Sequence, residues 1–437
     1  MKKLTSIYKQ IATAVVLLLL FTACKKDFYD PSGPSSDQAF SSPIAITDVA
    51  VGLQNWYTAA RGGLVYNTVT ADGLLTGQLY VVNAGNTDEA QLGTGGGSLL
   101  NTNGVVTGIW SVSNKIIYDA NKIIAKAPGV ISDKKYLATL IGYTSIFKAL
   151  AMSDMAMYWQ NAPDGVADTF NVSKVKFIPN TQAFTNAIAV IDNAISGMTT
   201  NGATGTEIAK YVPGGIDIMN TLNALKARFA VLSGNYPLAL TTANLVNLSV
   251  KSYFNYNAVT TNPIFTLATA TNNIYQPVDL AMGLPAGLQP DPADKRIPFY
   301  IATSANPTYR INGFFNSVTA IVPVYLPGEM MLIKSECYAR ANDVVNGKAW
   351  LDSVVTKTAA KDPFGVGAAL PPSTVVTPAD ILDQVYRNRA IELYMSGLRL
   401  VDSRRFNRPQ AERKRNYFPY PFVERNDNPN TPADPPL

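Results

Sequence analysis

The sequence predicts an all-α protein in which helix pairs form a scaffold beside one loop-rich face. Three observations support this prediction. Over most of the chain, apolar residues recur every three or four positions, which is typical of amphipathic helices. Around Gly234, a Gly and a Pro separate two such stretches in the manner of a helix hairpin. Two long segments, 64–104 and 250–327, lack this periodicity and are rich in Asn, Thr and Tyr, so they are expected to form loops.

The composition excludes several kinds of chemistry. Hydrophobic residues make up 47% of the 437 residues, which is enough to bury a large core. The absence of His excludes Ser-His-Asp and Cys-His catalysis and His-ligated zinc. Two Cys cannot form a four-cysteine metal site or a disulfide framework. We therefore expect no cofactor and assign no metal-ligating residue, while a structural metal ion stays open.

The charge balance argues against a nucleic-acid partner. The chain has 36 Lys and Arg and 31 Asp and Glu, a net charge of +5. Three of the Lys fall within residues 1–23, which leaves 33 basic against 31 acidic residues, a net charge of +2. A nearly neutral chain lacks the broad basic surface that a nucleic-acid-binding protein presents.

Residues 1–23 are predicted to be a secretory signal peptide. Three Lys precede an apolar run at 11–21, and small residues follow it, which is the order of charged, apolar and cleavage regions in such signals. The apolar run is too short to cross a bilayer comfortably.

Cys24 is the predicted lipid attachment site. Ala23 directly before Cys24 resembles a bacterial lipobox, in which cleavage leaves a lipidated Cys at the N-terminus. The alternative is an ordinary signal peptide with an incidental Cys. Residues 25–27, Lys-Lys-Asp, resemble a signal that sends some Gram-negative lipoproteins to the cell surface. With a Pro-, Gly- and Ser-containing tether at 24–40, the chain is expected to be anchored to the outer membrane and exposed at the cell surface.

Four helices are predicted before the hairpin. Apolar spacing places them at 49–60, 109–124, 132–158 and 184–195, with Ser132 as the cap of the third. Trp56, Trp110 and Trp159 lie on these apolar stripes and are expected in the core.

The hairpin itself is the clearest local pattern. Leu225, Phe229 and Leu232 form one stripe, Gly234 ends that helix, and Pro237 opens the next, at 238–246. Its length and its small Ala residues resemble a tetratricopeptide repeat, although the full consensus is absent.

Three helices are predicted near the C-terminus. They lie at 328–341, 349–356 and 377–397. The last has a strong start, since Thr377 can cap it and Pro378 and Asp380 fall in its first turn.

The segment at this last helix resembles the SusD/RagB family, the surface nutrient-binding lipoproteins of Gram-negative outer membranes. Residues 389–406 read Arg-Ala-Ile-Glu-Leu-Tyr-Met-Ser-Gly-Leu-Arg-Leu-Val-Asp-Ser-Arg-Arg-Phe and are similar to the C-terminal signature of that family. Further family-like segments lie at 110–124, 147–163, 291–296, 328–340, 417–421 and 428–430.

The resemblance implies a single SusD-like domain at 41–437, with tetratricopeptide-like helix pairs and a loop-rich ligand-binding face. It also implies that the protein captures oligosaccharides and passes them to a SusC-like TonB-dependent transporter. Some members of the family handle peptides, so a peptide ligand stays open, as does a scaffold role without a small ligand.

Four residues in the two aperiodic segments are candidate ligand contacts: Tyr80, Asn83, Tyr275 and Tyr309. An aromatic face can cover the apolar face of a sugar, while Asn amides can satisfy its hydroxyls. Tyr is also common in loops without any ligand role. We expect the two segments to meet on one side of the scaffold and form a shallow, weakly charged site.

Two other interpretations are weaker. The Arg-rich segment 387–415 could bind phosphate, but it is expected to form ion pairs and helix caps within the scaffold. A glycosidase needs two paired carboxylates, and nothing in the sequence pairs any two of Asp72, Asp164, Asp217 and Asp291. The chain is therefore not expected to be an enzyme.

Overall fold

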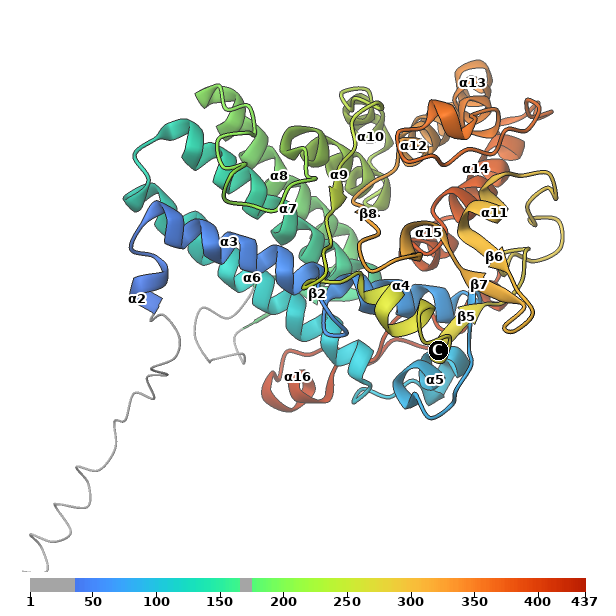
Figure 1. Ribbon diagram of the computed structural model, residues 1–437, viewed down its shortest axis with the longest axis horizontal. Helices are drawn as coiled ribbons and strands as arrows, with labels where there is room; N and C mark the ends of the chain where they lie inside the picture. Colours follow the sequence, from blue (N-terminus) through green and yellow to red (C-terminus); the bar gives the residue numbers. More distant parts are fainter. Residues whose placement is uncertain (1–35, 166–174) are drawn as a thin grey trace, which may run out of the picture.

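The computed structural model describes residues 36–165 and 175–437. The predicted signal peptide, Cys24 and most of the predicted tether lie outside these residues. Long helices fill the left half of Figure 1, and the C-terminal helices and several short strands lie on its right. No helix within the described ranges is both long enough and apolar enough to cross a membrane.

The first long helices pack against one another in a stack. Helix α3 packs on α6, α6 on α7, and α7 on α8. Their bounds are Ser36–Ala39 for the short α2, Pro43–Thr58 for α3, Gly104–Val130 for α6, Lys134–Tyr158 for α7 and Asn180–Asn201 for α8. The four predicted helices are confirmed, but the predicted cap of the third is wrong. Asp133, not Ser132, caps α7, since its carboxylate accepts from the backbone N–H groups of Lys135 (2.9 Å) and Tyr136 (3.1 Å).

The predicted hairpin is confirmed. It consists of α9 (Ile218–Leu232) and α10 (Tyr236–Ala243). Gly234 lies between them with φ at +82°, a backbone conformation that favours glycine. The Phe229 side chain is fully buried and stacks on Phe184 of α8, with 6.4 Å between the ring centroids.

The C-terminal helices form a second packed group. Their bounds are Pro327–Arg340 for α12, Val344–Val355 for α13, Pro378–Glu392 for α14 and Arg399–Arg405 for α15. The last helix, α16 (Phe422–Asp427), lies apart from this group, below α6 in Figure 1. Thr377 and Asp380 form a capping box at the start of α14. The predicted end of that helix is wrong. It stops at Glu392, and the chain turns through Met395 and Gly397, both with positive φ, into α15.

Segment 64–104 is not a loop, and that prediction is wrong. It contains α4 (Leu64–Leu75) and α5 (Thr87–Thr94), separated by strand β1 (Leu79–Val81). Every residue of α4 is buried. A helix that is buried all round carries no apolar stripe, so the sequence showed no periodicity there.

Segment 250–327 is largely irregular, as predicted. It holds the strands β4 (Tyr253–Phe254), β5 (Tyr275–Pro277), β6 (Ile301–Thr303), β7 (Tyr309–Ile311) and β8 (Val322–Pro323), the helix α11 (Arg296–Tyr300), a π-helical turn (Phe265–Thr269) and a 3₁₀ turn (Gly313–Phe315). The strands pair only as antiparallel two-stranded sheets, β1 with β5, β4 with β8 and β6 with β7. A fourth sheet, β2 (Asn161–Pro163) with β3 (Phe177–Pro179), follows α7.

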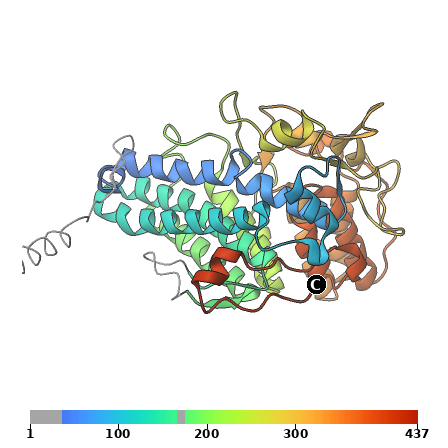
Figure 2. The same ribbon diagram turned by 90° about the horizontal axis from the view of Figure 1, so that it is seen from below.

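Two of the three Trp predictions are confirmed. Trp110 and Trp159 are buried, with 4.9 Å between their ring centroids. Trp110 also donates a hydrogen bond to Glu424 of α16 (3.3 Å), the helix that crosses beneath the stack in Figure 2. Trp56 is 47% exposed, so its predicted burial is wrong. The buried stripe of α3 is Ile46, Ala50, Leu53 and Tyr57, and Trp56 lies at its edge.

Candidate ligand-binding face

The two segments that were expected to meet are joined through a small sheet. Strand β1 pairs antiparallel with β5, so that Tyr80 lies opposite Gln276 and Val81 opposite Tyr275. Two further backbone hydrogen bonds extend the pairing, from Val82 N to the Ile274 carbonyl (3.0 Å) and from Val278 N to the Gln78 carbonyl (3.1 Å). The segments around residues 80 and 275 therefore lie side by side.

Tyr80 and Asn83 lie on the surface of this junction. The Tyr80 side chain is 41% exposed. The side-chain amide of Asn83 donates to the side-chain oxygen of Asn273 (3.2 Å), and its own oxygen accepts from the backbone N–H of Gly85 (2.9 Å). These bonds fix the Asn83 amide in place, and its second N–H has no partner among residues 36–165 and 175–437.

Tyr275 lies beneath the surface. Its side chain is fully buried, and its hydroxyl accepts a hydrogen bond from Thr70 of α4 (3.1 Å). Burial raises the pKa of Tyr275 above its ordinary value of 10.0. All three residues of β5 are buried, and Tyr275 points into the core. Its ring supports the junction and has no surface for a ligand.

Tyr309 lies on the neighbouring sheet. It is half-buried in β7, opposite Thr303 of β6, and β7 packs beside β5. Of the four candidates, Tyr80 lies on β1 and Tyr309 on β7, two strands that both neighbour β5, and Asn83 follows β1 by two residues. We call the surface formed by β1, β6, β7 and segment 278–303, which lies over the buried strand β5, the loop face.

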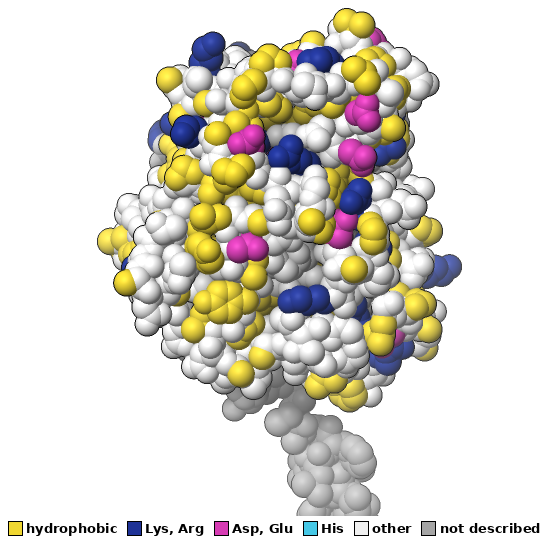
Figure 3. Space-filling model, turned by 90° about the vertical axis from the view of Figure 1, so that its right-hand side faces the viewer, with side chains coloured by type: hydrophobic (Ala, Val, Ile, Leu, Met, Phe, Trp, Pro, Cys, Tyr) yellow, Lys and Arg dark blue, Asp and Glu magenta, His cyan; other side chains and the backbone are white. Residues whose placement is uncertain are grey.

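A groove of about 560 Å³ opens on the loop face. It is lined by Leu280, Ala281, Gln289, Pro290, Pro292, Ile297, Pro298, Ile301, Ala302 and Thr303. Figure 3 views the molecule from this side and shows hydrophobic and uncharged polar side chains with scattered charges between them. None of these residues was among the predicted ligand contacts, although four Pro between 285 and 298 mark a segment unsuited to a long helix or a central strand.

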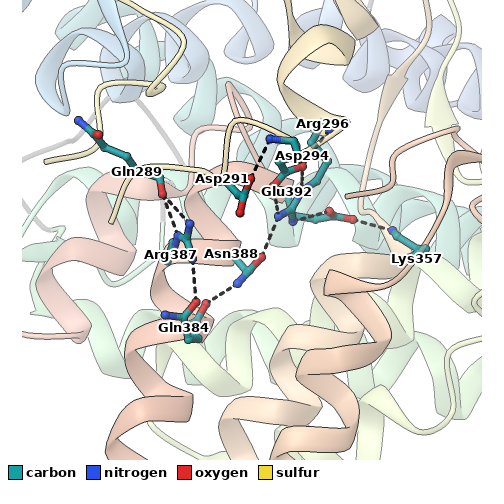
Figure 4. Close-up of polar contacts among 10 residues, drawn as sticks. Gln289, Asp291, Asp294, Arg296, Lys357, Gln384, Arg387, Asn388 and Glu392 are labelled. Carbon is teal, nitrogen blue, oxygen red and sulfur yellow. Dashed lines mark hydrogen bonds and ion pairs between the residues drawn. The ribbon is translucent and has the colours of Figure 1, made fainter. Parts of the chain in front are cut away.

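Buried ion pairs hold the groove segment on the scaffold, as Figure 4 shows. Arg296 donates to Asp294 (2.7 Å between Nη2 and Oδ2), to Glu392 of α14 (3.1 Å) and to Asn388 (2.8 Å). Lys357 donates to the other oxygen of Glu392 (2.7 Å). All five of these residues are buried, so the removal of one partner would leave an uncompensated charge or polar group in the core.

Two Arg side chains also hold the backbone of segment 278–303, one from α14 and one from α15. Arg387 donates twice to the carbonyl oxygen of Gln289, through Nε (3.0 Å) and Nη2 (2.6 Å). Arg399 of α15 donates to the carbonyls of Met282 (2.9 Å) and Gly283 (2.8 Å). These contacts fix the backbone of the loop face without using any side chain of the groove.

The structural interpretation of the Arg-rich segment is confirmed. Each of its eight Arg donates a hydrogen bond to another group of this chain, namely Arg387, Arg389, Arg399, Arg404, Arg405, Arg408, Arg413 and Arg415. Asp402 pairs with Arg389 and Arg405, and Glu412 pairs with Arg408. Glu392, which was also expected to pair with Arg of this segment, pairs with Arg296 and Lys357, which lie outside it, so that part of the prediction is wrong.

The candidate carboxylates have separate structural contacts. Asp217 caps α9 by accepting from Asn220 N (2.9 Å), and Asp291 accepts from Ala293 N (2.8 Å). Asp72 accepts from the backbone N–H of Leu400 (2.6 Å). Among residues 36–165 and 175–437, no group of three or more Cys, Asp or Glu side chains could hold a metal ion.

No model of a known protein family and no curated protein matches this sequence. Solved structures do match it. A SusD superfamily protein from Bacteroides vulgatus aligns with a TM-score of 0.69 at 13% identity, over 90% of this chain and 99% of the other. A SusD-like carbohydrate-binding protein from Bacteroides fragilis gives 0.69 at 15% identity, and a laminarin-binding SusD-like protein gives 0.66 at 14% identity, each over 90% of this chain and 99% of the other. This chain therefore has the SusD-like fold.

Proposed function

Proceeding from the SusD-like fold, we propose that this chain binds oligosaccharides on its loop face and acts in nutrient capture at the cell surface. The observation that carries the proposal is the meeting of two distant segments in one exposed junction. That junction combines the rings of Tyr80 and Tyr309, the amide of Asn83 and an adjoining apolar groove. Two of the structural neighbours are named as carbohydrate-binding and laminarin-binding, which supports this class of ligand.

The chemistry of the junction suits a neutral sugar chain. A Tyr ring can cover the apolar face of a pyranose, and the amides of Asn83 and Gln289 can bond its hydroxyls. The open shape of the groove favours several sugar units bound weakly along it. A capture protein must release its cargo, so we expect a dissociation constant between micromolar and millimolar, about −8 to −4 kcal/mol.

We further propose that Cys24 carries a lipid anchor and that the protein delivers its ligand to a SusC-like TonB-dependent transporter. The motifs at the N-terminus and the family-like C-terminal segment support this part of the proposal. Co-purification of a TonB-dependent transporter from outer membranes with the full-length lipoprotein would support it. Recovery of the lipoprotein alone, under conditions that preserve such complexes, would contradict it.

The proposal assigns no catalysis to this chain. Incubation with a bound glycan should leave its chain length unchanged, since the separate contacts of Asp72, Asp217 and Asp291 do not provide the paired carboxylates of a glycosidase. Shortening of the glycan by the purified protein would contradict this assignment.

Titration calorimetry against a glycan panel tests the ligand class. The panel should include laminarin oligosaccharides, with a set of unstructured peptides in parallel. Binding of at least one glycan and of no peptide is the expected result. Binding of peptides alone would replace the oligosaccharide by the peptide alternative, and binding of neither would favour a scaffold role.

A further inference from the structure

A second cavity, of about 320 Å³, lies on the other side of the segment that lines the groove. We call it the α14 cavity, because helix α14 and residues 370–375, in the loop before that helix, form much of its lining. Its polar lining residues are Asp291, Asp294, Arg296, Gln384, Arg387 and Asn388. The α14 cavity and the groove both have volumes in the range of ligand pockets, about 300–1,000 Å³.

Residues 290–297 form a partition between the two cavities. Pro290 and Pro292 line the groove, whereas Asp291 between them lines the α14 cavity. Further along, Ile297 lines the groove and Arg296 lines the α14 cavity. The partition is therefore a single backbone, about 5 Å across if it is compared with one strand of a sheet. Asp291 and Pro292 are exposed, so a ligand can lie across its rim.

The partition is held in place from the side of the α14 cavity. Arg387 donates twice to the Gln289 carbonyl at its start, and Arg296 donates to Asp294 and to Glu392 of α14 at its end. Figure 4 shows these bonds. A ligand that crosses the rim would therefore meet a surface that is already ordered, which lowers the entropic cost of binding.

Two side chains of the α14 cavity have hydrogen-bonding capacity left. One oxygen of Asp291 accepts from Ala293 N (2.8 Å), and the other has no partner among residues 36–165 and 175–437. The oxygen of the Gln384 amide accepts from Nη1 of Arg387 (3.2 Å), while its nitrogen donates to no group of the described ranges. In Figure 4 the carboxylate of Asp291 points to the side of the partition on which Gln384 and Arg387 lie.

This combination fits the hydroxyl groups of a neutral sugar. A hydroxyl can donate to the carboxylate of Asp291, and another can accept from the amide of Gln384. Neither sign of charge is favoured in a ligand, because Asp291 and Arg387 line the same cavity with opposite charges. Leu370 and Val375 add apolar surface, against which the C–H groups of a sugar ring can pack.

We propose that the α14 cavity is a second subsite for the glycan of the loop face, and that a glycan of several units lies across the rim with one end in this cavity. The inference rests on the proposed function, because it needs an oligosaccharide as the ligand. It adds a requirement for chain length. Short glycans reach the groove alone, whereas longer ones reach both cavities and bind more tightly.

Titration calorimetry with a series of chain lengths tests the second subsite. The probes are laminarin, cello-, xylo- and malto-oligosaccharides from the disaccharide to the octasaccharide. Asp291→Asn keeps the oxygen that accepts from Ala293 N, and Gln384→Glu keeps the oxygen that accepts from Arg387. Each variant thus changes only the atom that is free for a ligand. For the octasaccharide that the wild type binds, each should weaken binding about tenfold, since each removes one hydrogen bond that involves a charged group or a buried amide.

The shortest oligomer that the wild type binds is the internal control, and both variants should bind it with wild-type affinity. Asp48→Asn makes the same change of charge at an exposed position of α3 and should bind every length as the wild type does. Equal octasaccharide affinity of the Asp291 and Asp48 variants would overturn the second subsite and leave the proposed function standing. Equal weakening of the shortest and longest oligomers would also overturn it. Binding of no glycan at all would overturn both.

Discussion

The backbone N–H of Leu400 donates a hydrogen bond to Oδ1 of Asp72 at 2.6 Å, across 328 positions of the chain. Asp72 lies in α4 and Leu400 in the first turn of α15, so a side chain from one helix caps the other. Gln78, just after α4, accepts from the backbone N–H of Met395 (3.1 Å) in the preceding turn. The N-terminal side of the loop face is thereby attached to the C-terminal helices.

Asp72→Ala should lower the free energy of unfolding by about 1–3 kcal/mol, because it leaves a buried helical N–H without an acceptor. Asp72→Asn keeps an acceptor oxygen and should lose less. Urea unfolding at pH 7, followed by circular dichroism, compares the two variants. An equal loss of unfolding free energy in both variants would show that the carboxylate charge of Asp72, and not its hydrogen bond to Leu400, stabilises the fold.

Buried Asp154 should make stability depend on pH. Burial raises the pKa of its carboxyl from an ordinary value of 3.8 to about 8, with Tyr57 and Arg228 as its polar neighbours. Between about pH 4 and pH 8 the folded protein holds a proton that the unfolded chain has released, so stability should fall as pH rises through that window. The slope for this group is at most about 1.4 kcal/mol per pH unit.

Asp154→Asn isolates this effect, since an amide cannot ionise. The difference in unfolding free energy between the variant and the wild type should move in favour of the variant from pH 5 to pH 8. If the unfolding free energies of the two proteins changed with pH in parallel, Asp154 would ionise near its ordinary pKa.

Phe229→Ala should lower the free energy of unfolding by about 3–5 kcal/mol, because it opens a cavity where Phe229 stacks on Phe184. Leu245→Ala is the control, since that side chain is exposed after α10. Thermal melts should show a large loss for the first variant and little for the second. An unchanged melt for Phe229→Ala would remove this hairpin from the core.

Cys24→Ala should release the mature protein from membranes, because the proposed lipid anchor has no other attachment point. Cys337→Ala is the control, since Cys337 is the buried free thiol of α12, and burial raises its pKa to about 12. Fractionation of cells that express each variant measures the effect. Equal outer-membrane levels of the Cys24 variant and the wild type would contradict lipidation.

The scaffold could be predicted because its helices have one buried and one exposed face. Helix α8 is an example, since Phe184, Ile188 and Ile191 are buried and recur at helical spacing. The same argument failed for α4, in which Thr70, Asp72 and Gly73 are as buried as the apolar residues. The predicted burial of Trp56 was wrong for a related reason. A residue at the edge of an apolar stripe can lie on either side of the boundary between the buried and the exposed face of its helix.

The loop face could be predicted only in outline. Tyr80 and Tyr275 have similar neighbours in the sequence, yet one is exposed and the other fully buried. What separates them is the place of their strands: all three residues of β5 are buried, whereas Tyr80 of β1 reaches the surface. The two strands have three residues each and lie almost 200 positions apart. Strands this short have no detectable alternation of their own, so the sequence could not assign either side chain to a face.

The role of Tyr80 and Tyr309 in ligand binding is the central claim, and calorimetry on the variants Tyr80→Ala and Tyr309→Ala tests it most directly. For a glycan that the wild type binds, each variant should weaken binding about fivefold or more, since each removes one stacking ring. Trp56→Ala, which removes an exposed ring from α3, is the control and should bind as the wild type does. Affinity should also change little with added salt, because the site is weakly charged. Wild-type affinity in both Tyr variants would contradict the placement of the ligand on the loop face.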